Sequence, residues 1–269
     1  MAITKEMPVA LVTGASSGIG LATAQALRGA GYRVFGTSRR ANGSVSDGIT
    51  MLTCDVTDDA SVSAAVAAVL EQAGRIDLLV NNAGFGMAGA AEETSLEQTR
   101  QLFDVNLFGV IRMTQAVLPH MRQAARGRII NISSVFGFMP APYMAVYAAT
   151  KHAVEGYTQS LDHEVRGFGI RALVVEPANT KTAFDANLAY ADRSVDAYAT
   201  TRPMIHFMLK GMVETGDEVG VVSQAVLAAA LADKPRLRWP AGKGKKFSFL
   251  RRFVPEDAFD KSLRKQLGL

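Results

Sequence analysis

The sequence predicts one α/β domain built on a doubly wound parallel sheet, in three layers of helix, sheet and helix. Short runs rich in Val, Ile and Leu alternate with helical patterns, a glycine-rich turn joins the first run to the first helix, and no break in composition marks a second domain. With 269 residues the chain is long enough to bury one large core. These observations favour a Rossmann-like fold over residues 1–269.

The composition excludes several classes of protein. Apolar residues make up 48% of the chain and charged residues 20%, a globular balance, and the formal net charge is only +4. We find no nucleic-acid-binding motif and no apolar run of membrane-crossing length or of signal-peptide type. A single cysteine, Cys54, excludes an intramolecular disulfide and a thiolate metal cluster, which indicates a reducing compartment. We therefore expect a cytoplasmic, soluble protein without a metal.

The first β–α unit predicts a phosphate-binding turn. Pro8–Val12 is strand-like, the glycine-rich stretch Thr13–Gly20 follows it, and Leu21–Leu27 is a good helix former. Glycines let a backbone approach a pyrophosphate, and a helix N-terminus offers unpaired N–H groups. The glycine spacing departs from G-x-G-x-x-G, so a turn without a ligand is the alternative. The candidate cofactor-binding residues here are Gly14, Ser16, Ser17, Gly18, Ile19 and Gly20.

The end of the second strand, Tyr32–Thr37, indicates which dinucleotide would bind. A site for NAD usually has an acidic residue about twenty residues beyond the glycine turn, to hold the ribose 2′-OH. No Asp or Glu occurs from Arg33 through Ser46, and Ser38, Arg39 and Arg40 occupy that place instead. Guanidinium groups suit a phosphate, so the pattern favours NADP. The alternative is a solvated arginine pair before a turn at 42–48.

The next elements add polar groups at strand ends. Ile49–Cys54 is a third strand that leads to Asp55 and Val56, and Asp58 or Asp59 caps a helix over 60–73. Ile76–Val80 is a fourth strand that ends in Asn81-Asn82-Ala83-Gly84. One continuous helix is predicted from Ser95 to Arg122. It carries Asn106 on an apolar stretch, as a structural bridge or as part of a polar site.

The fifth strand, Gly127–Ser134, and the helix over 145–166 carry the candidate catalytic groups. Tyr147 and Lys151 share one face of that helix, because they lie four residues apart. Ser133 or Ser134 stands at the end of the strand, where catalytic groups collect in an open α/β sheet. We expect the ammonium to lower the pKa of the phenol, which would make the pair a proton-transfer device. Taken alone, the pair also fits a helix with one buried Tyr and one solvated Lys.

The remaining chain predicts a sixth strand at Gly169–Glu176, followed by Pro177–Thr182. The apolar, Met-rich segment 183–215 has no single period, and we interpret it as a substrate lid rather than as two ordinary packing helices. A helix at 218–232, a short strand at 236–239 and a helix at 256–267 follow. The basic tail over 241–269 could bind anionic lipid or an acidic partner, but a solvated tail is the simpler interpretation.

Over residues 8–240 the chain resembles the short-chain dehydrogenase/reductase family. The matches occur in order and at family-like separations, namely Thr13-Gly-x-x-x-Gly18-x-Gly20, Asn81-Asn-Ala-Gly84, Asn106, Ser134 and Tyr147-x-x-x-Lys151. Phe168–Arg171 and Val175–Pro177 are similar to the NADP-preferring ketoreductase and hydroxysteroid dehydrogenase branch. The resemblance implies hydride transfer between NADP(H) and a small-molecule carbonyl or alcohol, in a homodimer or homotetramer.

The resemblance also implies roles for single residues. Tyr147 would be the general acid or base, Lys151 would lower its pKa and hold the nicotinamide ribose, and Ser134 would polarise the carbonyl. Asn106 would anchor a water. Further cofactor contacts are implied for Asp55, Val56, Asn82, Ala83, Gly84, Pro177, Thr180 and Thr182. Ala178 departs from the family's Pro-Gly, so the backbone near the nicotinamide is expected to shift. Two alternatives remain, a 3-oxoacyl thioester reductase and an NADP-sensing regulator without catalysis.

Overall fold

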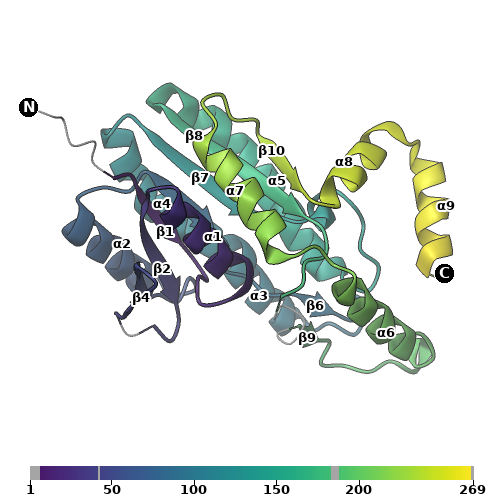
Figure 1. Ribbon diagram of the computed structural model, residues 1–269. Helices are drawn as coiled ribbons and strands as arrows, with labels where there is room; N and C mark the ends of the chain where they lie inside the picture. The colour runs from purple at the N-terminus through teal and green to yellow at the C-terminus, as the bar shows by residue number, and fades with distance from the viewer. Residues whose placement is uncertain (1–6, 42, 183–187, 268–269) are drawn as a thin grey trace, which may run out of the picture.

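The computed structural model describes residues 7–41, 43–182 and 188–267, and its centre is an eight-stranded sheet (Figure 1). The strand order is β10-β8-β7-β5-β1-β2-β4-β3, in which β3 alone pairs antiparallel and the other seven strands are parallel. The bounds are β1 Val9–Val12, β2 Arg33–Ser38, β3 Val45–Ser46, β4 Ile49–Thr53, β5 Leu78–Asn81, β7 Gly127–Ile132, β8 Ile170–Pro177 and β10 Arg238–Ala241. The predicted doubly wound sheet is confirmed, and the predicted turn at 42–48, of which residue 42 lies outside the described residues, contains the short strand β3.

Burial on both faces explains the continuous apolar strands. Successive side chains of one strand point to opposite faces, so Leu11 belongs to one core cluster and Val12 to the other. One cluster lies beneath the helices α2 (Asp59–Ala73), α4 (Gly109–Gln123) and α5 (Ala145–Val165). The other lies beneath α1 (Gly18–Gly29) and α7 (Val219–Leu231). These two helical layers complete the predicted three-layer architecture.

Local capping fixes where α2 begins and ends. The carboxylate of Asp58 accepts a hydrogen bond from Ser61 N at 2.9 Å, so Asp58 rather than Asp59 is the N-cap. Gly74 ends the helix in the left-handed conformation with φ of 72°, which suits glycine.

The predicted continuous helix at 95–122 is wrong in its middle. Helix α3 (Leu96–Phe103) runs into a π-helical turn, Asp104–Phe108, before α4 begins. The Gly109 N–H donates to Asp104 O, which is the five-residue spacing of a π turn, so one extra residue is accommodated there. Asn106 lies in this turn and is 1% exposed. The turn lets the helix present a polar side chain inward without ending.

The segment after β8 is tied to the loop that precedes α3. Residues 183–187 of the predicted lid lie outside the described residues. Beyond them, β9 (Ala189–Tyr190) pairs with β6 (Met87–Ala88), and α6 (Thr201–Glu214) follows. The buried carboxylate of Glu93 accepts from Val195 N at 2.9 Å and pairs with Arg202 at 2.5 Å.

The C-terminal region is more ordered than a solvated tail. Helix α8 (Gly244–Phe253) occupies part of the region that we interpreted as a tail, and α9 (Glu256–Leu267) matches the predicted terminal helix. Both helices project from the right-hand end of the molecule in Figure 1.

A buried carboxylate fixes α5 against the start of β8. Asp162 is fully buried, accepts from Ala172 N at 3.0 Å, and pairs with Arg166 and with Arg171 at 2.8 Å. Burial acts to raise the pKa of Asp162, but the two guanidinium groups and the Ala172 N–H outweigh it and lower that pKa. This anchor determines where the other end of α5 lies, and that end carries Tyr147.

We predict that Asp162→Ala lowers the free energy of unfolding by about 1–3 kcal/mol, because the buried Ala172 N–H loses its charged acceptor, whereas Arg166 and Arg171 are partly exposed and can be hydrated. Urea denaturation monitored by circular dichroism measures the change. Glu164→Ala on the exposed side of the same helix is the control and should stay within about 0.5 kcal/mol of the parent. Equal stabilities of the two variants would contradict the assigned anchor.

Candidate active site

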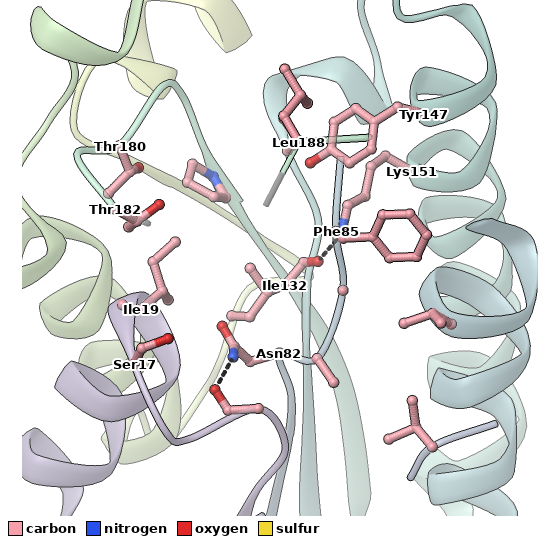
Figure 2. Close-up of a pocket in the computed structure, with 18 of the residues that line it drawn as sticks. Ser17, Ile19, Asn82, Phe85, Ile132, Tyr147, Lys151, Thr180, Thr182 and Leu188 are labelled. Carbon is pink, nitrogen blue, oxygen red and sulfur yellow. Dashed lines mark hydrogen bonds between the residues drawn. The ribbon is translucent and has the colours of Figure 1, made fainter. Parts of the chain in front are cut away.

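A cavity of about 1100 Å³ opens at the carboxyl ends of β1, β2, β5, β7 and β8, where ligands bind in open α/β sheets (Figure 2). It brings together nearly all the candidate residues. Those that line it are Gly14, Ser16, Ser17, Gly18, Ile19, Ser38, Arg39, Arg40, Asp55, Val56, Asn82, Ala83, Gly84, Ser134, Tyr147, Lys151, Pro177, Thr180 and Thr182. Gly20 and Asn106 do not line the cavity, and each supports a residue that does.

The glycine turn is shaped by contacts that leave no room for side chains. Gly14 and Gly18 have φ of +64° and +56°, a region that favours glycine. A Cβ on Gly20 would lie 2.2 Å from Gly14 O, so this glycine lets α1 pack against the turn. The result is an exposed run of backbone at the start of α1, the cradle that a pyrophosphate requires.

Hydrogen bonds hold the glycine turn to the end of β5. The Asn82 amide donates to Thr13 O at 2.9 Å and to Gly14 O at 3.1 Å, and a dashed line in Figure 2 marks a hydrogen bond of this amide. In return, Thr13 Oγ1 accepts from Asn82 N at 2.9 Å and from Ala83 N at 3.0 Å. Thr13 was not among the candidates from sequence. Its position directly before the first glycine is the signal that identifies it.

The far end of the cavity is cationic. Arg39 and Arg40 are exposed at the end of β2 and line the cavity together with Ser38. Asp55 lies nearby but is engaged by Thr57, whose N–H donates at 2.9 Å and whose hydroxyl donates at 2.7 Å. These two bonds lower the pKa of Asp55, and Arg39 adds to the effect. The geometry leaves the guanidinium groups available to an anion.

Tyr147 and Lys151 extend from α5 into the same part of the cavity (Figure 2). Both are at least nine-tenths buried, and Lys151 Nζ lies 5.7 Å from the centroid of the Tyr147 ring. The ammonium donates to Ile132 O at 2.9 Å. The hydroxyl of Ser134 interacts with Tyr147, whereas Ser133 interacts with Glu155 on the other side of the strand end. Of the two serines, Ser134 is therefore the one beside the phenol.

Burial dominates the titration of this pair. It raises the pKa of the Tyr147 phenol, and Ser134 lowers it by less. Burial lowers the pKa of Lys151 to about 8, against the opposing effect of the Glu155 carboxyl. We expected Lys151 to depress the pKa of Tyr147, and that expectation is wrong for the net shift. The ammonium is directed to Ile132 O, and desolvation of the phenol outweighs it.

Asn106 connects two walls of the site from behind. Its Oδ1 accepts from Phe85 N at 3.1 Å, and its Nδ2 donates to Phe85 O at 2.9 Å and to Thr150 Oγ1 at 3.3 Å. A Cβ on Gly84 would lie 2.9 Å from Asn106 Oδ1, so the strand end passes close by. This geometry is that of a structural bridge, and the implied role in holding a water stays a prediction.

The loop after β8 keeps an ordinary backbone despite Ala178. The described residues other than glycine that have positive φ are Asp47, Ala125 and Tyr143, so Ala178 needs no left-handed conformation. Asp217 holds this loop, because its N–H donates to Asn179 O and its carbonyl accepts from Lys181 N, both at 2.8 Å. Thr180 and Thr182 lie beside the start of α1 (Figure 2), and a Cβ on Gly18 would lie 3.5 Å from the Thr182 side chain.

A buried carboxylate pair lies one helical turn beyond Lys151. Glu155 is 3% exposed and Glu176 is fully buried, and Arg238 Nε lies 3.1 Å from an oxygen of each. Burial raises the pKa of both carboxyls, and for Glu176 the neighbouring Glu155 adds to the rise. One guanidinium does not compensate two desolvated carboxylates, so the pair retains a proton above the ordinary carboxyl range. No motif in the sequence singled out this pair.

Because these pKa values are higher in the folded chain than in the unfolded one, the folded state binds more protons. The free energy of unfolding then falls as the pH rises above about 4.5, the ordinary value for Glu. We predict that Glu176→Gln flattens this fall, since the amide cannot ionise. Thermal unfolding between pH 5 and 8 measures it, with Glu71→Gln on an exposed helix face as the control. A parallel pH dependence in Glu176→Gln and the parent would refute the shared proton.

The opposite end of the cavity, around Tyr147, is apolar. Leu188 and Leu209 pack on the core cluster that contains Tyr147 and Met144. The apolar residues that line this end are Phe85, Phe136, Met144, Leu188, Leu209 and Met212. Three of them, Leu188, Leu209 and Met212, come from the predicted lid segment, which therefore contributes to the wall. No helix within the described part of the chain is long and apolar enough to span a bilayer.

Comparison with known proteins agrees with this geometry. The model of the short-chain dehydrogenase family matches residues 8–192. The chain is 46% identical over 179 residues to a 3-ketodihydrosphingosine reductase of Bacteroides thetaiotaomicron, covering 66% of each chain. It is 36% identical over 251 residues to mouse 17-beta-hydroxysteroid dehydrogenase type 1, covering 86% of this chain and 72% of that one.

Solved structures extend the similarity to the whole chain. A short-chain dehydrogenase from Streptomyces avermitilis has a TM-score of 0.83 at 33% identity, covering 99% of this chain and 96% of that one. Neighbours at 26% identity were solved with different cofactors. A Burkholderia phymatum enzyme in complex with NAD has a TM-score of 0.80 and covers 95% of each chain. A serine dehydrogenase with NADP⁺ has a TM-score of 0.75 and covers 86% of this chain and 93% of that one. The chain thus belongs to the short-chain dehydrogenases, oxidoreductases that use a nicotinamide cofactor.

Proposed function

We propose that the protein is an NADP(H)-dependent carbonyl reductase, or an alcohol dehydrogenase in reverse, for apolar or amphipathic substrates. The observation that carries the proposal is one cavity with a cationic end at Arg39 and Arg40, a glycine cradle, and an apolar end around Tyr147. Consumption of NADPH with a panel of steroids, aromatic ketones, aldehydes and 3-oxoacyl esters tests it. Absence of turnover with every member would favour the alternative of an NADP-sensing regulator.

The residues present fit a dinucleotide. The backbone of Gly14 to Ile19 would hold the pyrophosphate, Asp55 and Val56 would contact the adenine, and Thr182 would face the carboxamide. A nicotinamide bound in this site supplies or accepts a hydride. Arg39 and Arg40 would hold the 2′-phosphate through charge-assisted hydrogen bonds, which is why we favour NADP over NAD.

The raised pKa of Tyr147 keeps the phenol in the protonated form that a general acid needs. A phenol that stays protonated at neutral pH can donate its proton to a carbonyl oxygen as charge develops there. Ser134 lies beside that hydroxyl and would donate a hydrogen bond to the same oxygen. Lys151 has a pKa of about 8, so it is mainly cationic at neutral pH and would stabilise negative charge that forms on Tyr147.

The apolar end of the cavity supports an apolar substrate. Leu188 from the segment before β9, and Leu209 and Met212 from α6, would cover a substrate bound at Tyr147. We therefore propose that the lid consists of the described part of 188–215, anchored through Glu93 and Arg202. The names of the two relatives above point the same way, since a ketosphingoid base and a steroid are both largely apolar.

Assembly and location are further parts of the proposal. We propose a homo-oligomer formed through the long helices over 96–123 and 145–165, which size-exclusion chromatography with light scattering would test. We also propose a cytoplasmic location, supported by the single, buried Cys54, which has no cysteine partner in the sequence.

We predict that Tyr147→Phe lowers kcat by about 10²–10⁴-fold, because the general acid is lost. The dissociation constant for NADPH should change little, since the ring and its packing remain. Steady-state kinetics and fluorescence titration measure the two quantities. Tyr157→Phe, on the same helix but in the core beneath the sheet, is the control. Near-parental turnover in Tyr147→Phe would exclude Tyr147 as the proton donor.

We predict that Arg39→Gln with Arg40→Gln raises KM for NADPH by about 10–100-fold, because charged hydrogen bonds to the phosphate are lost. KM for NADH should change less than threefold, roughly the scatter of a neutral surface change. Arg122→Gln, at an exposed position near the end of α4, is the control. If the turnover of the parent enzyme with NADH equals or exceeds its turnover with NADPH, the assignment of this end of the cavity is wrong.

A further inference from the structure

We propose that the exposed face of α8 docks the protein onto an anionic lipid surface. This basic aromatic face consists of Lys245, Lys246, Phe249, Arg252 and Phe253, all of which are exposed. It lies outside the cavity and takes no part in the proposed chemistry.

The two phenylalanines make the face unusual for a solvated helix. Phe249 is 63% exposed and Phe253 is 64% exposed, and their ring centroids lie 4.7 Å apart, because the residues are one helical turn apart. On the other side of α8, Phe247 and Leu250 are half-buried, so the helix already has an inward apolar face. Phe249 and Phe253 add apolar surface on the outward face of α8. Exposing this surface to water is unfavourable, and a partner that covered it would remove that cost.

The charges that α8 itself carries are all positive, and its one ion pair among the described residues joins Arg251, outside this face, to Glu256 of α9. Lys245, Lys246 and Arg252 share the face, Arg252 lies 5.7 Å from the centroid of the Phe253 ring, and α8 contains no acidic residue. Residues 241–269 hold eight Lys or Arg against three Asp or Glu, a formal charge of +5, whereas the whole chain has +4. The rest of the molecule is therefore close to neutral, and the cationic character is concentrated here.

This combination fits a lipid headgroup region better than a protein partner. An amphipathic helix with aromatic side chains flanked by Lys and Arg places its rings at the acyl boundary and its cations among anionic headgroups. A second copy is disfavoured, because a symmetric contact would bring two cationic faces together. An acidic protein would satisfy the charges, but charge alone would not cover the two tilted phenylalanine rings, which lie 4.7 Å apart and are both more than half exposed.

The helix is held firmly enough to act as a docking element. Lys243 N donates to Asp217 Oδ2 at 2.8 Å, and a Cβ on Gly244 would lie 2.5 Å from Glu176 O, so the start of α8 packs tightly on the end of β8. Helix α6 projects from the same end of the molecule in Figure 1 and carries Phe207, which is 81% exposed. A substrate that partitions into a bilayer would then meet the lid at the membrane, a consequence that rests on the proposed function.

Flotation with vesicles tests the docking without any measurement of activity. The full-length protein is mixed with vesicles of phosphatidylcholine, with or without phosphatidylglycerol, at about 0.1 M and about 1 M salt, between which the Debye length falls from about 10 Å to 3 Å. We expect binding only to the anionic vesicles, and much weaker binding at high salt. Arg252→Gln should weaken binding about fivefold, and Phe249→Ser with Phe253→Ser at least about tenfold.

Phe168→Ser is the matched control, because Phe168 is 48% exposed and precedes β8 at the opposite end of the strands. It should float like the parent protein. Circular dichroism and NADPH binding confirm that each variant is folded. Equal binding by the double phenylalanine variant and the parent would overturn the proposal. A second outcome would also overturn it: the parent protein does not float, and the double phenylalanine variant has a different oligomeric state, which would assign the face to a second copy. Salt-sensitive capture of an acidic carrier protein without flotation would likewise overturn it.

Discussion

The four hydrogen bonds between the glycine turn and the end of β5 are the constraint on which the site depends. Thr13 and Asn82 each use side chain and backbone to join two strand ends that are neighbours in the sheet but far apart in the sequence. A turn of glycines has no intrinsic rigidity, since glycine loses the most conformational freedom on folding. The threonine and the asparagine supply that rigidity from outside, and the close packing of Gly20 on Gly14 leaves the turn one arrangement.

Burial determines the pKa shifts of Tyr147 and Lys151 at the other end of the cavity. The same desolvation raises the pKa of Tyr147 and lowers that of Lys151, so the two pKa values move apart. At neutral pH the phenol is therefore protonated and the ammonium is mainly cationic, which are the charge states that the proposed acid role requires. Behind them, the Glu155 carboxyl opposes the pKa shift of Lys151, and the pKa of Glu155 is itself raised by burial, against the opposing effects of Ser133 and Arg238. The charge state of the cavity end around Tyr147 is therefore coupled, through Glu155, to Arg238 on the edge strand β10.

The features that could be predicted from the sequence are those that depend on residues close together in the chain. Alternating apolar strands, the glycine turn and the i, i+4 pair Tyr147 and Lys151 all have local signatures, so the sheet and most of the cavity wall were predicted correctly. The direction of the net pKa shift of Tyr147 was not predicted, because its burial depends on Phe136, Leu188 and Leu209, which lie outside its own helix. The pairing of Glu155 with Glu176 depends on two elements meeting in space. Helix α8 was missed because its cations dominate the composition and hide a helical spacing of phenylalanines.

The π-helical turn at Asp104–Phe108 limits how the helix that contains it can be redesigned. The one surplus residue rotates the side chains that follow it by about 100° around the helix axis. The inward-facing residues of α3 and α4 therefore could not all face the interior in a regular helix of the same sequence. Removing a single residue from this turn would restore uniform winding and rotate either Asn106 or the core methionines of α4 out of register. A chimera that takes this segment from another protein must therefore conserve its length, even where every side chain is exchanged.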